Sequence, residues 1–253
     1  MNLAELLDIR PGVTAVTGGG GKTTLLRTLG TELAADGARV LLCATTKLLP
    51  FDGLPNLMNP TETALAEALA ARRPVCAGTP VPGTGKLTAP GIPMARLAVL
   101  ADYVLAEADG AAGRPLKAHA PHEPVIPPEA DQIIMLAGAS GFGRPVREAV
   151  HRPERFCSLT GLEPGDPVTP EALAEALRME ASTEGPPIRV FVNQAEGEAA
   201  LAAARRLAEL LPWPVYAGAL KRRSWICLSS FAEPGISPPA RPSASGGRDS
   251  GWP

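Results

Sequence analysis

Gly-Gly-Gly-Gly-Lys-Thr-Thr, residues 18–24, directly follows the apolar run Val-Thr-Ala-Val-Thr at residues 13–17. Glycines allow successive backbone N–H groups to turn toward an anion, because no Cβ stands in the way. A helix that begins near Lys22 would direct its positive N-terminal end at the same point. The order of strand, glycine loop, Lys-Thr and helix therefore predicts a P-loop, the phosphate-binding turn of nucleotide-binding α/β proteins.

Each part of this loop has an expected role. The Lys22 ammonium group would contact the β- and γ-phosphates, and the Thr23 hydroxyl would hold Mg²⁺. The long motif, G-x-x-x-x-G-K-[ST], needs a glycine where this chain has Val16. The shorter G-x-x-G-K-T-T still offers four glycine amides before the lysine, but it leaves the path around the β-phosphate open. The residues predicted to contact the nucleotide here are Gly18, Gly19, Gly20, Gly21, Lys22, Thr23 and Thr24.

Length and composition favour one α/β domain. The chain has 253 residues, of which 45% are hydrophobic, enough to bury a sizeable core. Its 24 basic and 26 acidic residues give a formal net charge of −2, so no overall field attracts nucleic acid or an anionic membrane. The sequence begins with no signal-peptide pattern and contains no apolar run of about 20 residues. We therefore expect a cytoplasmic protein without a nucleic-acid or membrane partner.

Predicted strands and helices alternate along most of the chain. This alternation is typical of βαβ units and predicts a three-layer fold like that of P-loop NTPases, with a mostly parallel central sheet. Asn59 is the expected N-cap of one helix, because Pro60 and Glu62 follow it. We expect one P-loop α/β domain over residues 1–220 and a low-complexity, disordered tail over residues 221–253. The predicted strands after the loop are 39–44, 75–78, 103–106, 132–136, 188–192 and 214–217.

Two acidic residues follow the predicted strand at 103–106. Glu107 and Asp109 are two residues apart, so both carboxylates would point to the same side of an extended backbone. One could bind Mg²⁺ or its water while the other orients a nucleophile. The structural alternative is a solvated turn after the strand. Lys47 follows the strand at 39–44 and is predicted to contact the nucleotide, because ligands of such sheets bind at the carboxyl ends of strands.

A basic, proline-interrupted loop at residues 114–124 comes next. It could close over a nucleotide or hold an anionic substrate, with Lys117 or Arg114 neutralising charge in phosphoryl transfer. Arg152, in a second charged cluster, could act as an arginine finger in cis. Three alternatives stay open for the histidines: ligand contacts, a metal site and a plain surface loop. A metal site would use His119, His122 and Glu123, although Pro121 excludes a helical arrangement of the two imidazoles.

Asn193 ends the predicted strand at 188–192, where related architectures read the nucleotide base. The sequence around it is similar to the guanine-reading pattern N-K-x-D, but Gln194 and Glu196 replace the lysine and the aspartate. Both ATP and GTP are therefore compatible with this sequence. The structural alternative is a strand-to-helix turn in which Asn193 is an N-cap.

Taken together, six motifs resemble the YqeC family over about residues 10–220. The resemblance implies an accessory protein for selenium-dependent molybdenum hydroxylases, acting in biosynthesis or insertion of the selenium-bearing cofactor, with such a hydroxylase as client. Asn193 fits the family pattern, whereas Gln194 and Glu196 depart from it. The motifs are Gly-Gly-Lys-Thr-Thr at 20–24, Thr-Thr-Lys at 45–47, Glu-Ala-Asp-Gly at 107–110, Pro-Leu-Lys at 115–117, His-Glu-Pro-Val-Ile-Pro at 122–127 and His-Arg-Pro-Glu at 151–154. The family motif places in the site Lys22, Thr23, Lys47, Glu107, Asp109, Lys117, His122, Glu123, His151 and Arg152.

Four functions are compatible with these residues. The first is an NTP-hydrolysing maturation factor. An ATP-dependent ligase is the second, because the short loop also resembles that of the Mur ligases, although 253 residues leave little room for their further domains. The others are a small-molecule kinase with residues 114–123 as a lid, and a nucleotide-sensing module without catalysis. The predicted catalytic residues are Lys22, Glu107, Asp109, Lys117 and Arg152, and the predicted Mg²⁺ ligands are Thr23, Glu107 and Asp109.

Overall fold

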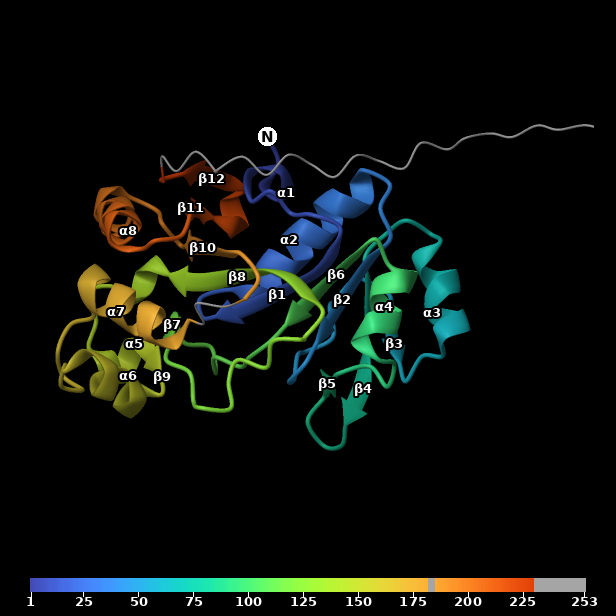
Figure 1. Ribbon diagram of the computed structural model, residues 1–253, viewed down its shortest axis with the longest axis horizontal. Helices are drawn as coiled ribbons and strands as arrows, with labels where there is room; N and C mark the ends of the chain where they lie inside the picture. Colours follow the sequence, from blue (N-terminus) through green and yellow to red (C-terminus); the bar gives the residue numbers. More distant parts are fainter. Residues whose placement is uncertain (182–184, 230–253) are drawn as a thin grey trace, which may run out of the picture.

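The computed structural model of the chain, which describes residues 1–181 and 185–229, confirms the predicted α/β fold with a mostly parallel central sheet (Figure 1). Within these residues the sheet has ten strands, and of its strand pairs only β11–β12 and β4–β5 are antiparallel. In spatial order the strands are β12 (Ser224–Cys227), β11 (Val215–Ala219), β10 (Ile188–Asn193), β8 (Ala130–Gly138), β1 (Gly12–Gly18), β6 (Tyr103–Glu107), β2 (Val40–Ala44), β4 (Val75–Val81) and β3 (Asn56–Met58), with β5 (Lys86–Thr88) paired to β4.

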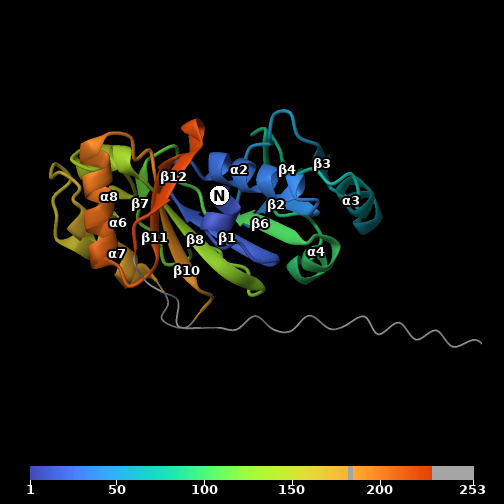
Figure 2. The ribbon, with the colours of Figure 1, turned by 90° about the horizontal axis from the view of Figure 1, so that it is seen from above.

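Helices cover both faces of this sheet. Val16 and Leu42 pack against α1 and α2, whereas Ala15 and Leu41 belong to the core on the opposite face. Figure 2 shows α2 on one side of the central strands and α4 on the other. In Figure 1, α5 to α8 gather near the β10–β12 end of the sheet. The helices are α1 (Leu3–Leu6), α2 (Lys22–Ala35), α3 (Glu62–Leu69), α4 (Met94–Leu100), α5 (Val146–Ala149), α6 (Pro153–Thr160), α7 (Pro170–Glu180) and α8 (Glu198–Leu210).

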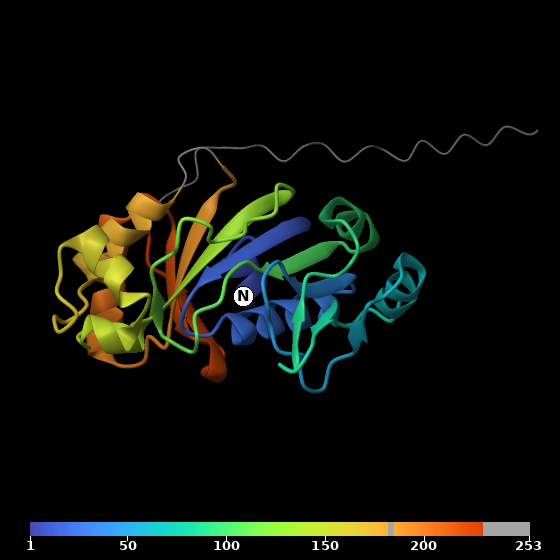
Figure 3. The ribbon, with the colours of Figure 1, turned by 90° about the horizontal axis from the view of Figure 1, so that it is seen from below.

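β1 occupies the centre of the sheet, between β6 and β8. Figure 3 shows β10 in orange, β8 in lime, β1 in blue and β6 in green fanning out with the twist of a parallel sheet. Val16 pairs with Glu107, and Glu107 also pairs with Ala44 of β2. The residues that follow β1, β2 and β6 therefore meet at one edge of the sheet, which is where ligands of such folds bind.

Two short strands outside the main sheet were not predicted. β7 (Leu116–Lys117) pairs with β9 (Val150–His151), so Lys117 lies directly beside His151. The pairing joins the predicted basic loop to the second charged cluster, 34 residues further along the chain. These strands have two residues each, too few for a periodic pattern to reveal.

Several local predictions can be compared with the structure. The predicted cap Asn59 is wrong: α3 begins after Thr61, whose hydroxyl accepts from the Ala64 N–H, while Asn59 has φ +50°. The segment 221–253 that was expected to be a tail includes strand β12, which extends the sheet along β11. The rest of that tail prediction, residues 230–253, lies outside the described residues. No helix in residues 1–181 or 185–229 is long and apolar enough to cross a membrane.

Candidate functional site

The glycine loop, residues 18–24, is held in place by hydrogen bonds from its own amides. The Gly18 N–H donates to Asp109 Oδ2 over 2.9 Å. Gly19 N–H donates to the Leu136 carbonyl and Gly20 N–H to the Arg114 carbonyl, over 2.9 and 3.1 Å. Three of the four glycine amides expected to be free for phosphate are therefore bound within the protein.

Close packing explains why glycines occupy these positions. Gly18 has φ +91°, and a Cβ there would lie 2.1 Å from the Leu136 carbonyl oxygen. Gly20 has φ +85°, and a Cβ there would lie 2.5 Å from the Gly138 Cα. A side chain at either position would clash with backbone that cannot move aside.

The start of α2 supplies a second set of donors. The Leu25 N–H bonds to the Gly21 carbonyl over 3.0 Å, as the first turn of the helix closes. The N–H groups of Lys22, Thr23 and Thr24 precede this bond and have no acceptor within the helix. An anion at this edge would therefore meet the helix N-terminus, not the row of glycine amides that the sequence suggested.

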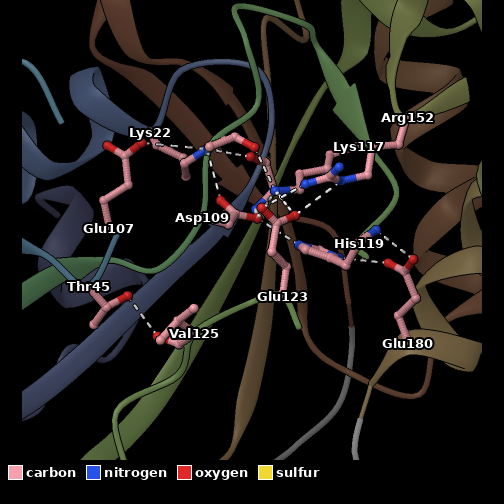
Figure 4. A network of polar contacts seen from close by, with 12 residues as sticks. Lys22, Thr45, Glu107, Asp109, Lys117, His119, Glu123, Val125, Arg152 and Glu180 are labelled. Carbon is pink, nitrogen blue, oxygen red and sulfur yellow. Dashed lines mark hydrogen bonds and ion pairs between the residues drawn. The ribbon is translucent and has the colours of Figure 1, made fainter. Parts of the chain in front are cut away.

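Lys22 lies between the two predicted acidic residues. Its side chain is 4% exposed, and its Nζ donates to the Gly18 carbonyl over 2.5 Å. The same Nζ lies 3.0 Å from Asp109 Oδ1 and 3.8 Å from Glu107 Oε1 (Figure 4). The structure thus places Lys22, Glu107 and Asp109 together, as the sequence predicted, but the lysine is turned toward the carboxylates.

Of these two acids, Glu107 has fewer hydrogen-bond and ion-pair partners. It is the last residue of β6 and is 8% exposed, and its Oε2 is buried without a hydrogen-bond partner. Burial raises its pKa to about 7, since the charge of Lys22 offsets the lost hydration only in part and Asp109 adds repulsion. Near neutral pH both protonation states of this side chain are therefore populated.

Asp109, which is fully buried, has many partners. Its Oδ2 accepts from the Gly18 N–H, lies 2.6 Å from His119 Nε2 and lies 3.3 Å from Lys117 Nζ. Burial alone would raise the pKa of Asp109, but the His119 hydrogen bond and the two lysine charges outweigh it and lower the pKa to about 2. Asp109 is therefore a permanent anion at the centre of the site.

Lys117 and Arg152 continue the network away from the glycine loop. Lys117 Nζ is fully buried, donates to the Gly110 carbonyl over 2.5 Å and lies 2.8 Å from Glu123 Oε2. Arg152, which is one-third exposed, lies 2.9 Å from the other oxygen of Glu123. The two cations lower the pKa of Glu123 against the opposing effect of its burial. Two of the predicted catalytic residues are thus joined through one carboxylate.

His119 and Glu180 extend the network on the far side of Asp109 (Figure 4). His119 Nδ1 lies 2.7 Å from Glu180 Oε2, and the His119 N–H donates to Glu180 Oε1 over 2.7 Å. Burial opposes protonation of His119, but the carboxylates on both nitrogens raise its pKa overall. No local pattern pointed to Glu180, because it lies 61 residues from His119 at the end of α7.

Asn193 has contacts that neither sequence interpretation anticipated. Its Nδ2 donates to the Gly20 carbonyl over 2.7 Å, and its Oδ1 accepts from the Leu220 N–H over 3.0 Å. The residue before α8 is Gly197, so Asn193 is not the cap of that helix. Its side chain fastens the glycine loop to the segment after β11.

Other predicted site residues are exposed and have no place in this buried network. Thr23 and Lys47 are exposed, as is His122. Arg114 is also exposed and donates to the Glu148 carbonyl. Among residues 1–181 and 185–229, no group of three or more His, Cys, Asp or Glu side chains could hold a metal ion, so the arrangement offers no site built from His119, His122 and Glu123.

Comparisons with known proteins agree with the sequence motifs. The sequence profile of the YqeC family, described as YqeC protein, matches residues 14–154, more than half of the chain. A protein of Escherichia coli (strain K12), described as "Uncharacterized protein YqeC", is 37% identical over 161 residues. The aligned part covers 61% of this chain and 63% of that protein, so the chain spans less than two thirds of the relative's length.

Proposed function

The chain belongs to the YqeC family, and from this premise we propose that it is a Mg²⁺-dependent P-loop protein that binds and hydrolyses ATP or GTP. The observation that carries the proposal is the position of Lys22, buried at the start of α2 with its ammonium group between Asp109 and Glu107. A nucleotide phosphate would offer this lysine a stronger anionic partner at the point where free helix amides already converge.

The residues present fit a magnesium ion at Glu107. Its Oε2 is a buried oxygen without a partner, and a hard cation would satisfy it. Thr23, exposed at the first turn of α2, would add the hydroxyl ligand. Asp109 fits less well as a direct ligand, because its oxygens already face Lys22, Lys117, His119 and the Gly18 amide. When bound, the ion would neutralise charge on the phosphates.

With a nucleotide and the ion bound, the residues of the network would have different roles. Lys22 would move from Asp109 to the phosphates, while Lys117 and His119 keep the Asp109 charge compensated. Glu107, whose pKa is raised to about 7, would release its proton when it takes up the ion. Arg152 is partly exposed at the edge of the network, which suits a cation that turns toward developing negative charge.

We place this activity in an accessory role, with hydrolysis resetting a state that delivers or activates a selenium or molybdenum cofactor on a client hydroxylase. Support for this role comes from the motif resemblance to the YqeC family, which extends beyond the glycine loop to residues 107–127 and 151–154. If the proposal is right, cells in which Lys22→Ala replaces the natural protein should produce the client hydroxylase with less cofactor. Metal and selenium analysis of the purified hydroxylase would measure this.

Calorimetric titration tests the nucleotide proposal directly. The intact protein would be titrated with non-hydrolysable ATP and GTP analogues, with and without Mg²⁺, beside Lys22→Ala. Lys86→Ala is a matched control, because Lys86 is exposed on β5, away from the glycine loop. We expect Mg²⁺-dependent binding that Lys22→Ala loses and Lys86→Ala keeps. The absence of binding to either analogue by the intact protein would overturn the proposal.

A further inference from the structure

A cavity of about 300 Å³ lies on the face of the sheet opposite α2, beside the glycine loop but separate from it. Its walls come from β8, from the start of β10, from the end of α7 and from the loop that follows His119. The volume is at the lower end of the range for small-molecule sites, roughly 300–1,000 Å³. Apolar side chains predominate in the lining, among them Pro124, Ile126, Ile133, Met135, Leu177 and Ile188.

Three polar residues also line this cavity: Thr17, His119 and Glu180. Thr17 is fully buried, and its Oγ1 has no hydrogen-bond partner. A buried hydroxyl left without a partner costs free energy, so a ligand group that bonds it would gain that energy on binding. The Thr17 hydroxyl is therefore the polar group in the lining that a bound ligand would stabilise by a hydrogen bond.

The charges around the cavity restrict the kind of ligand. Both ring nitrogens of His119 contact carboxylates, and both oxygens of Glu180 contact His119. Glu180 would repel an anion, while a cation would lose its hydration among apolar walls to face a carboxylate that His119 already pairs. A neutral molecule avoids both costs.

We infer that this cavity is a second ligand site, which binds a small, neutral, mostly apolar molecule through a hydrogen bond to the Thr17 hydroxyl. The site is independent of the nucleotide proposal, because none of its lining residues belongs to residues 18–24. It adjoins the glycine loop through Thr17, the residue before Gly18, and through His119, whose partner Asp109 also binds the Gly18 amide. The ligand and the nucleotide would thus lie on opposite sides of one buried carboxylate.

A matched pair of probes tests this inference: 2-naphthol, which carries one hydroxyl, and naphthalene, which carries none. Both are neutral, and fluorescence titration of the whole chain would give their affinities. We expect 2-naphthol to bind more tightly than naphthalene by about 2- to 10-fold, the typical worth of one hydrogen bond. Thr17→Val keeps the shape of the side chain and should remove this preference while leaving naphthalene affinity unchanged.

Two further variants locate the probes. Ala181→Phe would fill the cavity from a half-buried position in its lining and should abolish binding of both probes. Ala200→Phe is the control, because Ala200 is equally half-buried on α8 but does not line the cavity. Binding that persists in Lys22→Ala would show that this site does not depend on the nucleotide site. The inference is overturned if neither probe binds, if both bind equally well to the intact protein, or if Ala181→Phe leaves their affinities unchanged.

Discussion

The two sides of Asp109 differ in how completely their charged groups are paired. On the side of the glycine loop, Glu107 has one oxygen 3.8 Å from Lys22 and the other without a partner. On the opposite side, Lys117 is matched by Asp109, Glu123 and the Gly110 carbonyl, and His119 by two carboxylates. Both sides are buried, so exposure to water does not explain the difference.

This comparison distinguishes two groups of residues: those whose charges are paired within the chain, which form a scaffold, and those whose charges need a bound ligand as partner. A buried charge is tolerated when its partners are in place, and it is costly when they are missing. The Lys117–Glu123 side meets that condition within the chain itself. The Glu107 side would meet it only when something else binds, which is why we place the cation and the phosphates there.

The largest effect should come from removing the shared anion. Asp109→Asn would leave Lys22, Lys117 and His119 buried without their common counter-charge. Breaking a buried pair in this way costs about 3–5 kcal/mol. Because the pKa of Asp109 is held near 2, the carboxylate is charged throughout the neutral range, and the loss should be present at pH 5 as well as at pH 8. Chemical denaturation at both pH values would measure it.

Asp52→Asn provides the matched control for this variant, since Asp52 is exposed. A surface substitution of this kind usually changes the free energy of unfolding by less than about 0.5 kcal/mol. Equal, small losses for Asp109→Asn and Asp52→Asn would contradict our description of Asp109 as the central anion.

Glu107→Gln should raise the free energy of unfolding, whereas Asp109→Asn lowers it. The gain should depend clearly on pH. The pKa of Glu107 is raised from 4.5 to about 7, so between these values the unfolded chain releases its proton while the folded chain keeps it. The folded state therefore loses stability as the pH rises from 4.5 through 7, and the variant does not. Between pH 4.5 and pH 8, the free energy of unfolding of Glu107→Gln should therefore rise by on the order of 2–3 kcal/mol relative to that of the natural protein.

Denaturation curves of both proteins at intervals of pH would check this prediction without any nucleotide. Glu67→Gln, at an exposed position of α3, serves as the control and should show no such gain. If Glu107→Gln were less stable than the natural protein at pH 8, Glu107 would belong to the paired scaffold, and the two sides of Asp109 would be alike.

Much of the fold could be predicted because its signals are local and repeated. Buried parallel strands appear as short apolar runs, and the glycine loop marks the junction of β1 and α2. Cap choice was less predictable: Asn59 and Thr61 both suit a helix start, and only the backbone path decides between them. Pairings of two residues, such as β7 with β9, leave no periodic signal at all.

The sequence predicted some residues of the buried network, but not the contacts between them. Alternation along an extended backbone placed Glu107 and Asp109 beside Lys22, because that argument needs only neighbouring residues. The role of Asn193 as a fastener of the glycine loop depends on Gly20 and Leu220, which are distant in sequence. Glu180 could not be found for the same reason, because α7 comes next to His119 only after folding.

The smallest effect should come from Arg152, at the outer edge of the paired side. Its side chain is 33% exposed, and its partner Glu123 has a second cation, Lys117, whose Nζ lies 2.8 Å from it. Arg152→Gln should therefore lower the free energy of unfolding by less than about 1 kcal/mol, as for other partly exposed ion pairs. Denaturation of this variant and of Asp109→Asn would show whether an ion pair at the edge of the network contributes less to stability than the central carboxylate does. A loss as large as that of Asp109→Asn would mean that Arg152 is part of the buried scaffold, which would leave it unavailable to turn toward a phosphate.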